Sequence, residues 1–133
     1  MSEDHNNTTR IYFVGEEASK EQIRNTLINF DKQLFEIEGE SSPNQAFEKI
    51  KTIDHDVCMV DNLGSTKDYL DFVQDAIEVD CKVPLLLILS DEEEGLDHKL
   101  MEAGASACIY RNEITPFLLR RVIQYAQERF GNR

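Results

Sequence analysis

The chain has 133 residues, and its 26 acidic side chains against 14 Lys and Arg give a formal net charge of −12 with neutral His. This length suits one domain with a substantial core, and the charge argues against nucleic acid or an anionic membrane as a partner. The longest apolar run, Val83 to Leu89, is far shorter than the roughly 20 residues of a membrane span, and no signal peptide is visible. The three cysteines, Cys58, Cys81 and Cys108, lack CxxC spacing, and reduced thiols of this kind predict a cytoplasmic protein.

Short apolar runs alternate with segments of helical spacing along the chain. The runs predict strands over residues 11–14, 34–38, 57–60, 83–89 and 107–110. A helix is expected after each strand. The first two are signalled by capping boxes, Ser19 with Gln22 and Ser42 with Gln45. Gly104 is placed to end the fourth helix, and Thr115-Pro116 opens the fifth.

Five strand–helix units with short connections predict an α/β fold with helices on both faces of a parallel sheet. The usual solution for five units is a flavodoxin-like, doubly wound, three-layer fold with strand order 2-1-3-4-5. We expect the domain to span residues 10–130 and the polar segment 1–9 to be a disordered tail. The strand at 83–89 is the most hydrophobic and is expected at the centre of the sheet.

Charged and hydroxyl side chains leave the carboxyl ends of the predicted strands, where open parallel sheets bind ligands. Glu16 follows the first strand, Asp61 the third, Ser90 the fourth and Arg111 the fifth. Clustered carboxylates are costly without a divalent cation, and Mg²⁺ prefers such oxygen ligands. The sequence therefore predicts a functional site at this edge. The milder alternatives are that Asp61 only ends a buried strand and that Ser90 only caps a helix.

The chain from Arg10 to Arg129 resembles a response-regulator receiver domain of two-component signalling, the CheY-like family. The resemblance rests on the order and spacing of these segments: Ile11 to Glu17, His55 to Asp61, Pro84 to Ser90, Ala103 to Ala105, Cys108 to Arg111, and Ile123 to Arg129.

The resemblance implies that Asp61 accepts a phosphoryl group from a histidine kinase or phosphotransfer protein. It further implies Mg²⁺ held by Glu16, Asp61 and the backbone carbonyl of Leu63, with Ser90 and Arg111 contacting phosphoryl oxygens. Such a domain is no enzyme beyond taking up and losing its own phosphoryl group. It signals through protein contacts, which include a possible homodimer through the face of helix 4, strand 5 and helix 5.

Several residues depart from the family pattern. Gly15 stands where the family has the first of two acids. Arg111, with a planar guanidinium group, replaces a lysine with a compact ammonium group. Asp91 replaces a small residue after Ser90, and Cys108 replaces an aromatic switch residue. A phosphorylation-independent pseudo-receiver is therefore the alternative hypothesis, in which Arg111 pairs permanently with Asp61 and the domain binds a partner or dimerises constitutively. A flavodoxin-like small-molecule site is a weaker third option, because the Gly-Glu-Glu-Ala loop suits no anion.

Overall fold

The alternation of strands and helices predicted from the sequence is present in the computed structural model, which describes residues 8–31, 34–61, 64–90 and 95–131. The elements in chain order are β1 (Thr9–Val14), α2 (Glu17–Asp31), β2 (Phe35–Glu40), α3 (Pro43–Lys49), β3 (Val57–Asp61), α4 (Thr66–Glu78), β4 (Leu85–Leu89), α5 (Leu96–Ala103), β5 (Ala107–Tyr110), the 3₁₀ turn η1 (Arg111–Glu113) and α6 (Pro116–Gly131).

The five strands form one parallel sheet in the order β2-β1-β3-β4-β5, so the predicted doubly wound topology is confirmed. All five residues of β4 are buried, as its apolar sequence predicts. β4 is an interior strand, but β3 holds the middle position that the sequence analysis assigned to β4.

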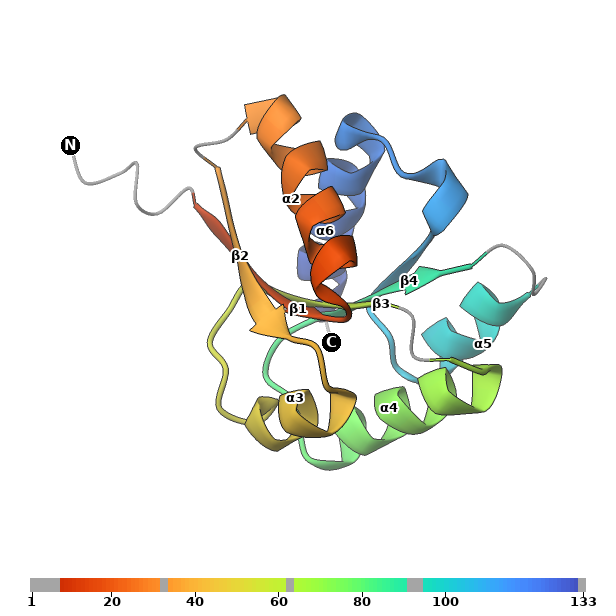
Figure 1. Ribbon diagram of the computed structural model, residues 1–133. Coiled ribbons are helices and arrows are strands. Elements are labelled where there is room, and N and C mark those ends of the chain that lie inside the picture. Colours follow the sequence, from red (N-terminus) through yellow and green to blue (C-terminus); the bar gives the residue numbers. More distant parts are fainter. Residues whose placement is uncertain (1–7, 32–33, 62–63, 91–94, 132–133) are drawn as a thin grey trace.

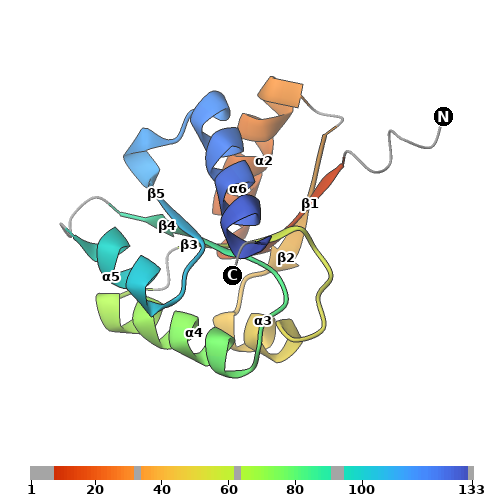
Figure 2. The same ribbon diagram turned by 180° about the vertical axis from the view of Figure 1, so that it is seen from behind.

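Helices cover both faces of the sheet (Figures 1 and 2). On one face α3, α4 and α5 pack against alternate strand residues such as Tyr12 and Val14. On the other face α2 and α6 pack against the intervening residues, such as Ile11 and Phe13. Because successive side chains of a strand point to opposite faces, one short apolar run supplies both cores. Among the described helices, none is long and apolar enough to cross a membrane.

The helix starts were predicted with mixed success. Ser42 accepts a hydrogen bond from the backbone N–H of Gln45 and so caps α3 as expected. The expected cap at Ser19 is wrong, because α2 already begins at Glu17. β1 begins at Thr9, inside the segment expected to be a tail, and the rest of that expectation falls on residues 1–7, outside the described part.

Candidate functional site

The carboxyl ends of the strands bring four of the predicted site positions to one edge of the sheet. Glu16 lies between β1 and α2, Asp61 ends β3, Ser90 follows β4 and Arg111 follows β5. The strands are parallel and neighbours, with Asp61 opposite Ile88 and Leu89 opposite Tyr110. These positions therefore lie at the same edge of the sheet, where Asp61 and Arg111 interact directly.

Asp61 and Arg111 form an ion pair at this edge. Asp61 is only 2% exposed, and the other four residues of β3 are apolar and buried. The Nη2 group of Arg111 donates a hydrogen bond to Oδ2 of Asp61, while the Arg111 side chain stays 40% exposed. A buried carboxylate is costly unless a cation or several donors compensate it. Arg111 is therefore the counter-ion that lets a carboxylate end a buried strand.

The backbone of Gly15 packs directly beside Asp61. A Cβ atom at position 15 would lie 3.3 Å from Cβ of Asp61 and only 2.8 Å from Cε2 of Phe13. The Phe13 ring is fully buried and so has little room to move aside. The ring thus fills the space that a carboxylate side chain at position 15 would need. The sequence carried no signal for this, because Phe13 has the pattern of an ordinary core residue.

Glu16 and Ser90 lie at the same edge but are exposed. The backbone carbonyl of Glu16 accepts a hydrogen bond from the N–H of Lys20 at the start of α2, and Glu17 pairs with Lys20 at 3.2 Å. Within the described residues, neither the Glu16 nor the Ser90 side chain forms a hydrogen bond or an ion pair with Asp61. The backbone carbonyl of Leu63 and the side chain of Asp91 fall on residues outside the described part.

The Mg²⁺ ligands expected from the sequence are Glu16, Asp61 and the backbone carbonyl of Leu63, and the last of these lies outside the described residues. Within residues 8–31, 34–61, 64–90 and 95–131, no three His, Cys, Asp or Glu side chains come together as metal ligands. The charge of Asp61 is already matched by Arg111, position 15 offers no carboxylate, and Glu16 points to an exposed surface. Mg²⁺ requires near-ideal octahedral geometry from hard oxygen ligands; of the expected ligands that the structure describes, Asp61 is paired with Arg111 and Glu16 is exposed.

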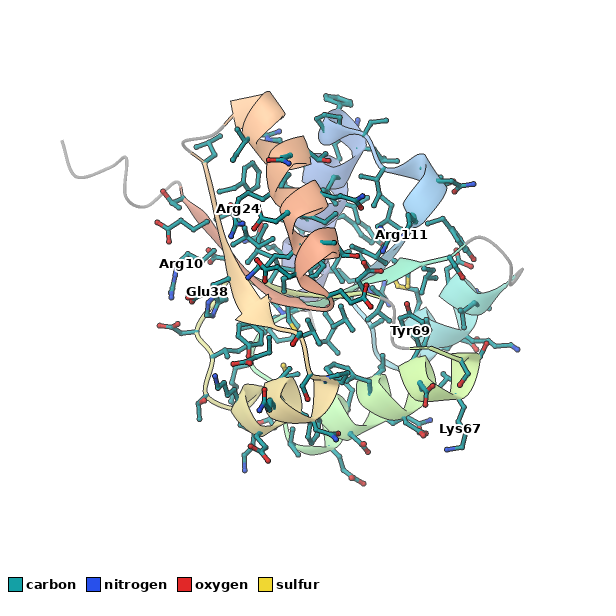
Figure 3. All side chains as sticks on the ribbon, in the orientation of Figure 1. Arg10, Arg24, Glu38, Lys67, Tyr69 and Arg111 are labelled. Atoms are coloured by element: carbon teal, nitrogen blue, oxygen red, sulfur yellow. The ribbon has the colours of Figure 1, made fainter. Side chains whose placement is uncertain are left out.

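Tyr69 is a site neighbour that the sequence analysis missed. Its hydroxyl is buried and donates a 2.8 Å hydrogen bond to the backbone carbonyl of Ile88, the residue paired with Asp61. In Figure 3, Tyr69 and Arg111 lie on opposite sides of the sheet at the same end. The first turn of α4 is thereby attached to β4 next to the ion pair.

Cys108 lies at the position of β5 where receiver domains, which this sequence resembles, have an aromatic switch residue. Burial, and secondarily the charge of Asp97, raises the pKa of its thiol to about 12. A thiol of such high pKa is protonated at neutral pH and a poor nucleophile. Cys108 is therefore a packing residue of β5.

Comparisons with known proteins identify the fold. No family model matches the sequence, and no curated protein matches it either. The chemotaxis response regulator CheY4 of Vibrio cholerae is 16% identical and superposes with a TM-score of 0.69, covering 90% of this chain and 98% of that one. The receiver domain of the putative response regulator NarL from Mycobacterium tuberculosis is 15% identical with a TM-score of 0.69, over 95% and 98% of the two chains.

A pilus assembly protein, CpaE of Caulobacter crescentus, is similar to the same degree. It is 14% identical with a TM-score of 0.69, and the match covers 88% of this chain and 91% of that one. The similar structures thus include chemotaxis and response-regulator receivers as well as a pilus assembly protein. The chain has the CheY-like receiver fold of response regulators.

Proposed function

We propose that this chain is a receiver-fold signalling module that binds a partner protein without accepting a phosphoryl group. One observation carries the proposal: Arg111 forms an ion pair with the carboxylate of Asp61. A second feature supports it, because the Phe13 ring beside Gly15 fills the place of a second acid. Both features remove something that phosphoryl transfer to an aspartate requires, namely a free nucleophile and a cation to neutralise the phosphate charge.

The ion pair makes Asp61 a weak acceptor for a steric and an electrostatic reason. An oxygen of Asp61 would have to attack the phosphorus of a phosphohistidine while the histidine nitrogen leaves. The carboxylate is almost fully buried, so the guanidinium would first have to release it and expose it to the donor. Separating the buried Asp61 carboxylate from Arg111, its counter-ion among the described residues, is unfavourable.

Phosphorylation of Asp61 is the second candidate, and the position of Ser90 favours it. Ser90 is exposed and lies two residues beyond Ile88, the strand partner of Asp61. A hydroxyl there could donate to an oxygen of a phosphoryl group on Asp61. In this case the partner is a histidine kinase or phosphotransfer protein, and Arg111 moves from the carboxylate to the phosphoryl group.

Intact mass after incubation with acetyl phosphate and Mg²⁺ separates the two candidates, with Asp61→Asn as the control. We expect no added phosphoryl group on either protein. One phosphoryl group on the wild type and none on the control would overturn the proposal in favour of phosphorylation.

A cytoplasmic location is part of the same proposal. The three cysteines are free thiols, two of them buried and one partly buried. Free thiols are typical of reducing compartments, where disulfides rarely persist. Signal transduction through protein contacts, rather than catalysis on a substrate, fits such a module.

A further inference from the structure

A groove runs between α3 and α4, on the face of the sheet opposite α2 and α6. It has a volume of 630 Å³ and is lined by Pro43, Asn44, Phe47, Glu48, Asp68, Phe72 and Asp75. The two helices lie side by side in both views (Figures 1 and 2). We call this feature the α3/α4 groove; neither the sequence analysis nor the site at Asp61 involves it.

The floor of the groove is aromatic. Phe47 of α3 and Phe72 of α4 meet edge to face, with ring centroids 6.0 Å apart and an angle of 73° between the planes. Phe72 is 7% exposed and Phe47 is partly buried, so the rings are anchored in the core yet border the groove. An apolar side chain entering the groove would contact these rings and lose water.

The walls of the groove are negatively charged. Glu48, Asp68 and Asp75 line it, and no Lys or Arg does. Two hydrogen bonds from Ser65, from its backbone N–H and its hydroxyl, lower the pKa of Asp68 and keep it ionised. Glu48 and Asp75 have no ion-pair partner in the part of the chain that the structure describes.

The lysines of these two helices are engaged elsewhere. Lys49 pairs with Glu40, and Lys67 pairs with Asp71 at 2.7 Å. In Figure 3, Lys67 lies at the end of α4 farther from α3. The groove therefore combines an apolar floor with three carboxylates, of which Glu48 and Asp75 have no ion-pair partner among the described residues.

We infer that the α3/α4 groove binds a basic segment of a partner protein that inserts an apolar side chain between Phe47 and Phe72. Charge complementarity selects this occupant, because Lys or Arg beside the apolar anchor would meet Glu48, Asp68 and Asp75. A second copy of this chain is a poor occupant, since two molecules of formal charge −12 repel each other. The inference deepens the proposed function by giving the chemistry of the partner.

The test is a titration of the ¹⁵N-labelled full chain with a short synthetic helical peptide of Lys, Ala and Leu that has its leucines on one face. An otherwise identical peptide with Glu for Lys serves as the control probe. We expect amide shifts concentrated in residues 43–49 and 65–75 with the basic peptide and none with the acidic one.

Matched variants separate binding in the groove from general attraction to an acidic protein. Glu48→Gln with Asp75→Asn should weaken binding about tenfold, because it removes two exposed charge pairs with the basic peptide. Glu113→Gln with Glu128→Gln removes the same charge from exposed positions outside the groove and should change binding less than about twofold.

Three results would overturn the inference: equal weakening by the two double variants, shifts centred outside the groove, or groove shifts that follow chain concentration without peptide. The last would identify a second copy as the occupant. The outcome is independent of the acetyl phosphate experiment. Phosphorylation of Asp61 with peptide bound in the groove would refute the proposed function and leave this inference standing.

Discussion

The carboxylate at the sheet edge and the carboxylates of the α3/α4 groove carry the same charge in opposite settings. Asp61 is buried and held by Arg111, so its charge is matched within the chain. Glu48 and Asp75 border an aromatic floor and have no cation of their own within the described residues. A matched charge stabilises the fold but attracts nothing, whereas an unmatched charge beside apolar surface can attract a cationic partner. The carboxylate at the sheet edge is thus less available to a partner than those of the groove.

Gly15→Asp should have the largest effect, because it forces a carboxylate into the space that the Phe13 ring fills. Overpacking and the repulsion from Asp61 together should lower the free energy of unfolding by about 3 kcal/mol, measured by urea denaturation. Glu16→Asp, which adds no side chain next to Phe13, is the control. A stable Gly15→Asp protein that gains Mg²⁺-dependent stability would show that the edge can rebuild a metal site.

Arg111→Ala should come next, since it leaves the Asp61 carboxylate buried without its counter-ion. We expect the free energy of unfolding to fall by about 2 kcal/mol, less than for a fully buried pair because Arg111 is 40% exposed. Adding Asp61→Asn to Arg111→Ala should recover most of the loss. Additive effects of the two substitutions in this double-mutant cycle would mean that the pair is not coupled.

Ser65→Ala should cost about 1 kcal/mol of stability through loss of the cap of α4. Ser42→Ala should cost less, because Ser42 makes one 3.4 Å bond whereas Ser65 and Asp68 bond reciprocally in a capping box. Loss of the Ser65 hydroxyl should also raise the pKa of Asp68 towards its ordinary value, which a carboxyl NMR titration measures.

The pH dependence of this cap has a defined sign. The pKa of Asp68 is lowered in the folded state, so its contribution is fully present above the unfolded-state pKa and is lost as pH falls through the folded-state pKa. The stability difference between the wild type and Ser65→Ala should therefore shrink in acid. A difference that grows as pH falls would contradict the assigned hydrogen bonds.

Ser90→Ala and Glu16→Gln should have the smallest effects. Both side chains are exposed and neither forms a hydrogen bond or ion pair with Asp61 among the described residues, so each change should alter the free energy of unfolding by less than about 0.5 kcal/mol. A decrease above about 1 kcal/mol in the free energy of unfolding of either variant, measured by urea denaturation, would contradict this. It would show that Ser90 or Glu16 contributes to the stability of the sheet edge.

The fold was predictable from the sequence because its signals are local and repeated. Alternation of short β-branched runs with helical spacing is enough to define a parallel sheet, and right-handed crossovers leave few orders for five strands. Chain order also predicted which residues meet at the carboxyl edge, since every parallel strand ends there. The possible pairing of Arg111 with Asp61 followed from the same topology.

Features that depend on side-chain packing could not be predicted in this way. Nothing in the spacing of Phe13 and Gly15 shows that the ring fills the place beside the glycine. Likewise, Phe47 and Phe72 lie on different helices, and their contact exists only once α3 and α4 are adjacent. The cap at Ser19 was wrong because Ser-x-x-Gln also occurs inside a helix, and only backbone geometry distinguishes the two.

The most direct test of the central claim is the amide NMR spectrum of the chain before and after addition of Mg²⁺ with beryllofluoride, a mimic of a phosphoryl group on aspartate. If Arg111 holds Asp61 and no metal site forms, the signals of Gly15, Asp61, Ser90 and Arg111 should not shift. Saturable shifts at these residues in the wild type, absent in Asp61→Asn, would contradict the account and identify the chain as a working phosphoryl acceptor.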